Sequence, residues 1–222
     1  MKIHFHILLS LVSTCLIAGE VRLFNGTDIN GWVKIGGKAT FAVEDGAIVG
    51  TTTRRTPNTF LSPPGVYSDF LLEFEVKCDR GFNSGVQIRS VTEETDISER
   101  VTGKPLEKAK MHLKRAGIMG PQVEIADNGR AGGVFFEGAG FWIQKPTASE
   151  AIDAYEPDGW NHYKIMAQGT RIQTWINGVP VIDIEEESSG LKSGIIGLQV
   201  HSIGKKEAEY QVRWRNITIR EL

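Results

Sequence analysis

Alternation of apolar and polar residues is the dominant pattern in this chain. From Phe70 to Cys78 every second residue is apolar, and the residues between them include Glu73 and Glu75. Successive side chains of a strand point to opposite faces, so this segment is predicted to be a strand with one buried and one solvated face.

Short turns divide the rest of the chain into further predicted strands. Asp45-Gly46 lies within 41–49 and Asn177-Gly178 within 171–181, and both dipeptides supply the positive φ angles that tight hairpins need. The alternation slips near Asn216, which predicts a bulge in the last strand. With many short strands and almost no helix, the chain is predicted to be all-β, a sandwich of two antiparallel sheets in one domain covering 20–222.

Residues 91–117 interrupt the strand pattern. Leucine and alanine recur at spacings of three and four from Pro105 to Ala116, and Gly117 follows directly. Proline at the start and glycine just past the end are typical of a short helix. Because this excursion joins two strands with candidate functional side chains, we expect it to lie over or beside the site.

The first 19 residues have the pattern of a signal peptide. A single lysine precedes a largely apolar stretch from Ile3 to Ile17, and Ala18 and Gly19 come before the first acidic residue. The pattern predicts export to the periplasm or the extracellular space, with a buried N-terminal strand as the alternative. Thr14 is unusual directly before the cysteine of a lipoprotein cleavage box, so simple export is favoured over an anchor at Cys15.

Composition and charge exclude some classes of partner. The 222 residues carry a formal charge of −2 without a basic stripe, which argues against nucleic acid. No second apolar run is long enough to span a membrane once the signal peptide is removed. Removal of the signal peptide would leave Cys78 without a disulfide partner, and we interpret it as a small buried thiol. The sequence does not indicate an oligomeric state.

Three predicted strands carry unusual side chains on their polar faces. Exposed faces usually hold threonine, lysine and serine, whereas these hold groups that bind hydroxyls or move protons. If the three strands share one sheet and their parity is aligned, these side chains form one surface, here called the polar wall. Its members are Gln87 and Arg89, Gln122 and Glu124, and Gln199 and His201.

A glycine-rich segment with several aromatic residues follows the central strand of the wall. Phe135, Phe136 and Trp142 lie within 129–142, and rings in such a segment suit the rim of a sugar site. The alternative is that these rings are part of the core, as large aromatics commonly are.

Motifs spread over essentially the whole mature chain resemble those of the 3-keto-disaccharide hydrolase family. The resemblance implies a concanavalin A-like jelly roll, usually exported, whose concave sheet faces carbohydrate. Many members have Glu and Gln where this chain has Gln122 and Glu124, and the swapped order resembles a subgroup pattern. The matching pieces, in order, are 23–26 with 31–32, 83–86 with 89, 120–125, 160–161, 177–178, 197–199 with 201, and 215–217.

The first hypothesis is an enzyme that cleaves a 3-keto glycoside. A ketone at C3 acidifies the C2 hydrogen, so a base can remove it, the enolate can expel the C1 substituent, and water addition completes net hydrolysis. Glu124 or His201 is the candidate base, and Arg89 is the candidate electrostatic stabiliser. The residues expected to bind the substrate are Gln87, Gln122, Gln199 and Trp142.

No cofactor is certain from the sequence. A divalent metal could replace or assist Arg89, although no compact ligand motif is present. Two of the candidates also have structural interpretations: Glu124 could form an ion pair with Arg89 across facing strands, and His201 could be a hydrogen-bonded sheet residue.

Two other functions remain open. One is a non-catalytic carbohydrate-binding or adhesion domain that uses the same wall, since the fold serves both purposes. A binding module has no use for a buried carboxylate, so an unpaired ionisable group in a closed site would favour the enzyme. The other is a conventional glycosidase that uses Glu73 and Glu75, although their face resembles the solvated outside of a sandwich.

Overall fold

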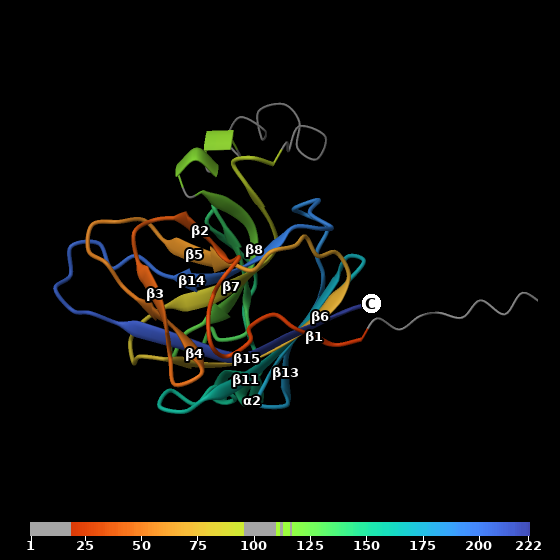
Figure 1. Cartoon of the computed structure of the whole chain (residues 1–222). Helices are drawn as coiled ribbons and strands as arrows, with labels where there is room; N and C mark the ends of the chain where they lie inside the picture. The colour runs from red at the N-terminus through yellow and green to blue at the C-terminus, as the bar shows by residue number, and fades with distance from the viewer. Residues whose placement is uncertain (1–18, 96–109, 112, 116) are drawn as a thin grey trace, which may run out of the picture.

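The computed structural model describes residues 19–95, 110–111, 113–115 and 117–222, which form two antiparallel sheets stacked as two layers (Figure 1). The first sheet has the order β13 (Val179–Glu185), β12 (Arg171–Ile176), β11 (Asn161–Gln168), β6 (Phe70–Cys78), β15 (Gln211–Glu221), β4 (Ala47–Thr51) and β3 (Thr40–Glu44), with β1 (Val21–Arg22) paired to β15. The second has the order β10 (Phe141–Gln144), β9 (Val134–Glu137), β8 (Ile118–Ile125), β7 (Ser84–Thr92), β14 (Ile195–Val200), β5 (Thr59–Ser62) and β2 (Val33–Gly36). A short helix, α2 (Ser149–Asp153), precedes β11. The predicted all-β sandwich is confirmed.

The core lies between the two layers. The alternation in β6 buries every second side chain from Phe70 onward and leaves those between them half-buried, as predicted. Val86 of β7 and Leu198 of β14 enter the same cluster from the opposite sheet. Complete burial of a side chain of this size contributes ~1.5–3 kcal/mol, so the cluster fixes which face of each strand points outward.

Both predicted hairpins and the predicted bulge are confirmed. Asp45 and Gly46 have φ angles of 50° and 74°, and Asn177 and Gly178 have 50° and 83°. Asn216 has a φ of 52° at the point where the register of β15 with β6 shifts.

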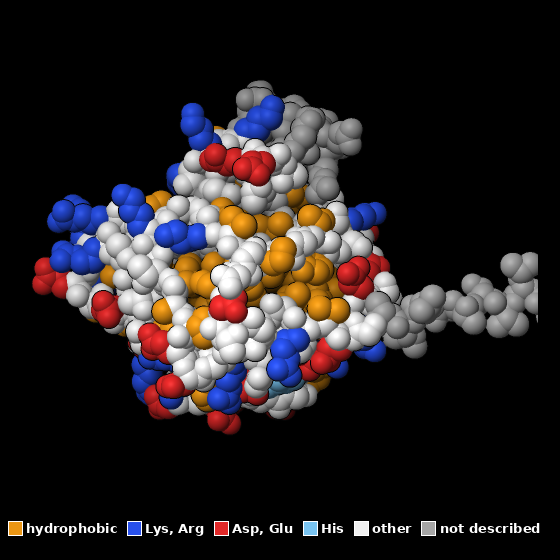
Figure 2. Space-filling view, in the orientation of Figure 1, with side chains coloured by type: hydrophobic (Ala, Val, Ile, Leu, Met, Phe, Trp, Pro, Cys, Tyr) orange, Lys and Arg blue, Asp and Glu red, His pale blue; other side chains and the backbone are white. Residues whose placement is uncertain are grey.

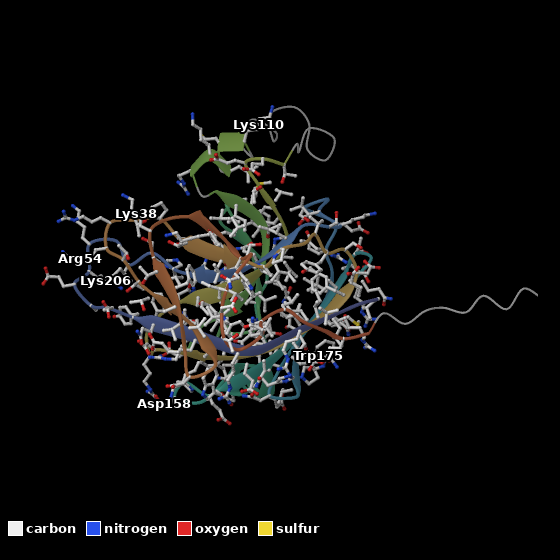
Figure 3. The ribbon with its side chains drawn as sticks, viewed as in Figure 1. Lys38, Arg54, Lys110, Asp158, Trp175 and Lys206 are labelled. Atoms are coloured by element: carbon white, nitrogen blue, oxygen red, sulfur yellow. The ribbon has the colours of Figure 1, made fainter. Side chains whose placement is uncertain are left out.

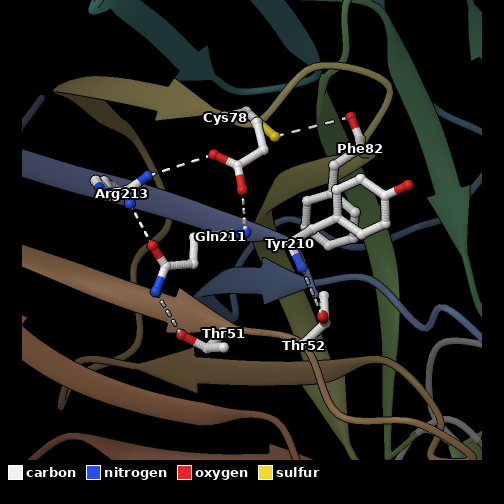
Figure 4. Close-up of polar contacts among 8 residues, drawn as sticks. Thr51, Thr52, Cys78, Phe82, Tyr210, Gln211 and Arg213 are labelled. Atoms are coloured by element: carbon white, nitrogen blue, oxygen red, sulfur yellow. Dashed lines mark hydrogen bonds and ion pairs between the residues drawn. The ribbon is translucent and has the colours of Figure 1, made fainter. Parts of the chain in front are cut away.

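Side-chain hydrogen bonds join β6, β15 and β4 where the three strands meet (Figure 4). Oδ2 of Asp79 accepts the backbone N–H of Gln211 at 2.7 Å, and Nε2 of Gln211 donates to Oγ1 of Thr51 at 3.2 Å. The Cys78 thiol is 4% exposed and donates to the Phe82 carbonyl at 3.7 Å. Cys78 is therefore a buried structural thiol, as its position suggested.

The outer face of the first sheet is solvated and charged. Nε2 of His162 lies 3.0 Å from Glu73, and Nη2 of Arg215 lies 2.6 Å from Glu75. Trp175 lies on the same layer, with Nζ of Lys164 5.1 Å from its ring (Figure 3). Each carboxylate of the predicted glycosidase pair thus has a partner on the outside of the sandwich, His162 for Glu73 and Arg215 for Glu75.

Charges of both signs occur on the surface. Figure 2 shows basic and acidic side chains around the edge of the face in view, with hydrophobic side chains gathered toward its middle. Lys38, Arg54 and Lys206 lie at one end of the sandwich (Figure 3), and Arg54 lies 3.4 Å from Glu207. The basic residues at this end are therefore accompanied by an acidic one.

The predicted helix in the excursion is confirmed where it is described. Residues 110, 111 and 113–115 are helical, and Gly117, with a φ of 76°, donates its N–H to the Leu113 carbonyl at 2.7 Å. Glycine at this position ends a helix without strain. The predicted start at Pro105 and the predicted last residue, Ala116, lie outside the described residues.

The predicted signal peptide also lies outside the described residues, apart from Gly19. The same holds for Cys15. Within the described ranges, no helix combines the length and the apolar character needed to cross a membrane.

A bulge in β7 turns Arg89 away from the polar wall. Arg89 has a φ of 47°, and the register of β7 with β8 shifts between Gln87 and Val91. The extra residue breaks the alternation, so the prediction that Arg89 shares a face with Gln87 is wrong. Its guanidinium instead donates to the carbonyls of Ser68 and Gly169, both at 2.6 Å. It also forms an ion pair with Asp69 at 2.9 Å.

We predict that Arg89→Met destabilises the fold. The substitution leaves Asp69 and two carbonyl groups without the donor they share. Because the Asp69 side chain is 37% exposed, water can solvate it, and the expected cost is about 1–3 kcal/mol, below that of breaking a fully buried pair. Urea unfolding measures the change in the free energy of unfolding, with Arg22→Met on the exposed β1 as the matched control, expected within ~0.5 kcal/mol of wild type. Equal stability of the two variants would show that the Arg89 contacts contribute nothing.

Candidate functional site

The three strands of the predicted wall are neighbours in the second sheet. β7 lies between β8 and β14, with Gln87 opposite Gln122 and Gly85 opposite both Glu124 and Gln199. Opposed residues of antiparallel strands share a face, so four of the six predicted side chains emerge together. They are almost completely buried, with exposed fractions of 0% for Gln87, 2% for Gln122, 4% for Glu124 and 0% for Gln199.

The three glutamines form one hydrogen-bonded group, here called the amide cluster. Oε1 of Gln122 accepts from Nε2 of Gln87 at 2.8 Å and from Nε2 of Gln199 at 2.7 Å. Ser90 Oγ donates to Oε1 of Gln87 at 2.7 Å. Oε1 of Gln199 is buried and has no hydrogen-bond partner in the described part of the chain, so the cluster retains an acceptor for a ligand hydroxyl.

Glycine in β7 makes room for the amide cluster. A Cβ at Gly85 would lie 2.6 Å from Cγ and Cδ of Gln122, closer than Cβ atoms approach other heavy atoms. A side chain at this position would therefore displace Gln122 and disturb its bonds to the two neighbouring strands.

Glu124 is a buried carboxylate held by neutral amides. Asn83 Nδ2 donates to its Oε1, and Gln122 Nε2 donates to its Oε2 at 3.1 Å. Burial raises its pKa from 4.5 to about 7, although these two hydrogen bonds and the charge of Arg130 act in the opposite direction. The anticipated ion pair between Glu124 and Arg89 is wrong, because Arg89 binds Asp69.

A second carboxylate, Glu137 of β9, lies on the same face. Its partner in the register is Gly120, which has the parity of Gln122. Asn58 Nδ2 donates to Glu137 Oε1 at 3.2 Å, and Gln199 Nε2 contacts Oε2 at 3.4 Å. Burial raises the pKa of Glu137 as well. The sequence pattern did not indicate Glu137, because residues 129–142 show no alternation that would predict a strand paired with β8.

His201 lies beside Glu137. It follows the end of β14, is half-buried, and its charge lowers the pKa of Glu137. Its Nδ1 is 2.8 Å from the carbonyl of Ser202. Because a carbonyl only accepts, Nδ1 carries a hydrogen in this contact.

Aromatic side chains form the rim of this face. Phe135 is opposite Gln122, Trp142 is opposite Phe135, and the two half-buried rings meet edge to face at 5.3 Å. The guanidinium of Arg130 and the ammonium of Lys145 lie 5.7 Å and 5.5 Å from the centre of the Trp142 ring. Trp142 therefore lies where it was predicted, beside the wall, and Arg130 is a cation near Glu124 that the sequence analysis did not identify.

The cation that accompanies Glu124 is thus not the predicted one. Arg89 is directed away, whereas Arg130 is exposed at the rim and acts on Glu124 electrostatically. Within the described ranges, no three side chains of the His, Cys, Asp and Glu types come together as a metal site. A divalent metal in this role stays a prediction.

A pocket of about 660 Å³ lies beyond the wall rather than directly in front of it. Its walls include Val33 and Ile35 of β2, Ile195 at the start of β14, and Lys114 and Arg115 of the excursion. Ile195 has the parity of Gln199 but lies four residues away along the strand, a distance of roughly 13 Å. The described end of the excursion therefore borders the same sheet as the amide cluster, at a pocket farther along β14.

We predict that Gly85→Ala is destabilising whereas Gly197→Ala is tolerated. A Cβ at Gly197 would meet Cβ of Gln87 at 3.5 Å and Cβ of Phe60 at 3.6 Å, which are ordinary contacts. Overpacking at Gly85 should cost about 1–3 kcal/mol. Thermal and urea unfolding of both variants measure the difference, and comparable losses would show that Gln122 is not held as tightly as its contacts indicate.

We predict that Glu124 makes stability fall as pH rises from about 4.5 to about 7. In this window the folded state holds a proton that the unfolded chain has already lost, so the free energy of unfolding decreases, by roughly 3 kcal/mol at most. Glu124→Gln removes this component. Urea unfolding across the window, with exposed Glu44→Gln as the control, tests it; identical pH profiles of wild type and Glu124→Gln would contradict the raised pKa.

Comparison with known proteins supports the fold and gives the family. Solved structures with the same fold include a candidate glycosyl hydrolase from Parabacteroides distasonis ATCC 8503, with 21% identity, a TM-score of 0.61, and coverage of 92% of this chain and 94% of that one. A carbohydrate-binding module from Bacillus subtilis has 17% identity, a TM-score of 0.57 and coverage of 86% and 96%. A Bacillus subtilis protein of unknown function with a galectin-like fold has 13% identity, a TM-score of 0.60 and coverage of 91% and 94%.

These identities are low, so the three structures show the fold alone. A comparison with curated proteins finds no match. The sequence profile of the 3-keto-alpha-glucoside-1,2-lyase-like domain matches residues 19–220, nearly the whole chain. The chain therefore belongs to the 3-keto-alpha-glucoside-1,2-lyase-like domain family.

Proposed function

We propose that this protein is an exported enzyme that breaks the bond between C1 and the glycosidic oxygen of a 3-keto glycoside, with Glu124 as the base. The observation that carries the proposal is a carboxylate that is 4% exposed, has only amide donors at its oxygens, and has a pKa raised to about 7. A base with a pKa near the working pH is both available and strong enough to remove a proton. Family membership supports the substrate class.

The proposed reaction begins with loss of the C2 proton. Glu124 takes that proton while the C3 carbonyl accepts the electron pair as an enolate. The enolate then reforms the carbonyl, a double bond forms between C1 and C2, and the C1–oxygen bond breaks. Arg130 is the candidate electrostatic stabiliser in place of Arg89, because its positive charge already acts on Glu124.

The amide cluster and the aromatic rim suit a sugar ring. Amide groups both donate and accept, so they can bind hydroxyls of either orientation, and Oε1 of Gln199 is an acceptor with no partner among the described residues. Trp142 and Phe135 provide an apolar surface beside Gln122 on which a ring face can lie. We assign substrate binding to Gln87, Gln122, Gln199 and Trp142.

A non-catalytic carbohydrate-binding domain is the second candidate. The same amides and rings would serve it, and the Bacillus subtilis carbohydrate-binding module has the same fold. What favours the enzyme is the cost of keeping Glu124 buried, with the half-buried Glu137 on the same face, without a direct ion pair to either carboxylate in the described part of the chain. Binding of neutral hydroxyls does not require that arrangement. Export rests on the pattern of residues 1–19.

We predict that the purified protein releases nitrophenol from a 4-nitrophenyl 3-keto-glucoside and that Glu124→Gln lowers kcat by about 100- to 10,000-fold. Because Glu124 acts as a base, kcat/KM should rise through a pH of about 7. Glu73→Gln, on the outer face of β6, is the control and should keep wild-type activity.

Parallel assays with EDTA test a divalent metal, and calorimetry with the non-oxidised glucoside tests simple binding. Saturable binding without turnover of any 3-keto glycoside would favour the binding domain. Full activity of Glu124→Gln would exclude Glu124 as the base.

A further inference from the structure

Five basic side chains gather at one end of the sandwich. They come from three segments that connect strands: 37–39 between β2 and β3, 52–58 between β4 and β5, and 201–210 between β14 and β15. Figure 2 shows basic side chains together at the left edge of the molecule, and Figure 3 labels three of the five there. All five are exposed, and the group is here called the basic end: Lys38, Arg54, Arg55, Lys205 and Lys206.

Hydrogen bonds between the three segments hold the basic end together. The backbone N–H of Arg55 donates to the Gly204 carbonyl at 2.7 Å. The Ser202 hydroxyl donates to the Thr56 carbonyl at 2.7 Å. The backbone N–H of Lys38 donates to Oγ1 of Thr56 at 2.8 Å, which joins the third segment to the other two. Cations that are far apart in the sequence are therefore presented on one cross-linked backbone.

The basic end adjoins the candidate site. Val200, the last residue of β14, pairs with the first residue of β5, so the segments that carry four of the cations leave the sheet one residue beyond Gln199. Asn58 connects these segments with the site. Its Oδ1 accepts the backbone N–H of Ser202 at 2.9 Å, and its Nδ2 donates to Glu137 at 3.2 Å. A chain of sugars that continues past the amide cluster at this end of the sheet meets the basic end next.

Most of the positive charge at this end is not neutralised by ion pairs in the described part of the chain. Arg54 lies 3.4 Å from Glu207, but the two side chains are 44% and 86% exposed, so this pair is weak. The other four cations form no ion pair with a described residue. The acidic residues of the three segments are Glu207 and Glu209, so positive charge is in excess here although the whole chain has a formal charge of −2. Such a local excess attracts anionic ligands.

The side chains at the basic end favour an acidic polysaccharide over a lipid surface. Proteins that lie on membranes usually insert apolar side chains beside their basic ones. The large apolar residues that are exposed in the described part of the chain all lie outside the three segments. The carboxylate or sulfate groups of a polysaccharide need no apolar anchor, because lysine and arginine bind them directly.

We propose that the basic end binds an acidic polysaccharide, a glycan chain with carboxylate or sulfate groups that contact these cations. The chain runs from the amide cluster past Asn58 to the basic end, so the sugar in the site is one unit of a charged polymer. The inference rests on the proposed function only where it makes that polymer the substrate class, since binding itself requires no turnover.

Binding of charged and neutral glycans by the full chain tests the proposal. Calorimetry measures the affinities for polygalacturonate, which carries carboxylates, for dextran sulfate and for neutral dextran. Wild type is compared with Lys205→Glu/Lys206→Glu, and with Arg22→Glu/Lys192→Glu as the control, in which two exposed cations elsewhere undergo the same change of charge. Thermal unfolding confirms that all three proteins are folded.

We expect wild type to bind at least one anionic polymer more tightly than dextran. Lys205→Glu/Lys206→Glu should weaken this binding about tenfold or more, whereas the control stays within about threefold of wild type. High salt should weaken the binding by wild type, because it screens exposed charges. The anionic polymer that binds more tightly identifies the preferred anion. Turnover of the short, uncharged 4-nitrophenyl 3-keto-glucoside should be the same in all three proteins.

Three results would overturn the proposal. The first is an absence of binding to both anionic polymers, and the second is an equal loss in the two double variants, which would show attraction to overall charge alone. The third is tighter binding to phosphatidylglycerol vesicles than to either polymer, lost in Lys205→Glu/Lys206→Glu, which would assign the basic end to a lipid surface. Failure of the proposed function is seen separately, as an absence of turnover by wild type.

Discussion

Glu124 is a carboxylate sealed beneath the surface of a sheet, with amide donors at both oxygens and no direct ion pair. Desolvation is the dominant influence on its pKa, and the amides offset only part of it. Everything assigned to the site depends on this balance. A lysine or arginine in direct contact would hold the carboxylate ionised and make it a weak base, whereas solvent exposure would return it to an ordinary surface residue.

The fold keeps Glu124 buried and unpaired by using the two faces of the second sheet differently. One face packs into the core, and the other holds the polar side chains of the site. Val123 and Ile125 point into the core between the sheets, so their burial fixes the opposite orientation of Gln122 and Glu124. The hydroxyl of Tyr163, from the other sheet, donates to the backbone carbonyl of Glu124 at 3.2 Å. Packing energy from the core thus holds the polar side chains in a position that they would not take up by themselves.

Strand parity explains which parts of the site could be predicted from the sequence. The alternation in 85–89, 120–127 and 198–201 placed three glutamines and Glu124 on one face, and the register confirms it. The prediction from strand parity was wrong at Arg89, because a residue with positive φ adds a bulge that the pattern of apolar residues does not reveal. The hairpin dipeptides, by contrast, encode their positive φ angles locally and were predicted correctly.

Glu137 and Arg130 were missed for a different reason. Both lie in or beside a glycine-rich segment whose pairing with β8 depends on long-range contacts rather than on local alternation. β5 was also not predicted, since all four of its residues are buried and no alternation marks it. Periodicity identifies strands with one wet face, whereas strands covered on both sides need the tertiary structure.

The most direct test of the account is the protonation state of Glu124 itself. Carbon-13 NMR of glutamate labelled at the side-chain carboxyl, assigned by comparison with Glu124→Gln, follows the Glu124 carboxyl as pH changes. The account predicts a titration midpoint at about 7. A midpoint at the ordinary value near 4.5 would show that the carboxylate is solvated or paired. That result would contradict the raised pKa on which the assignment of Glu124 as the base depends.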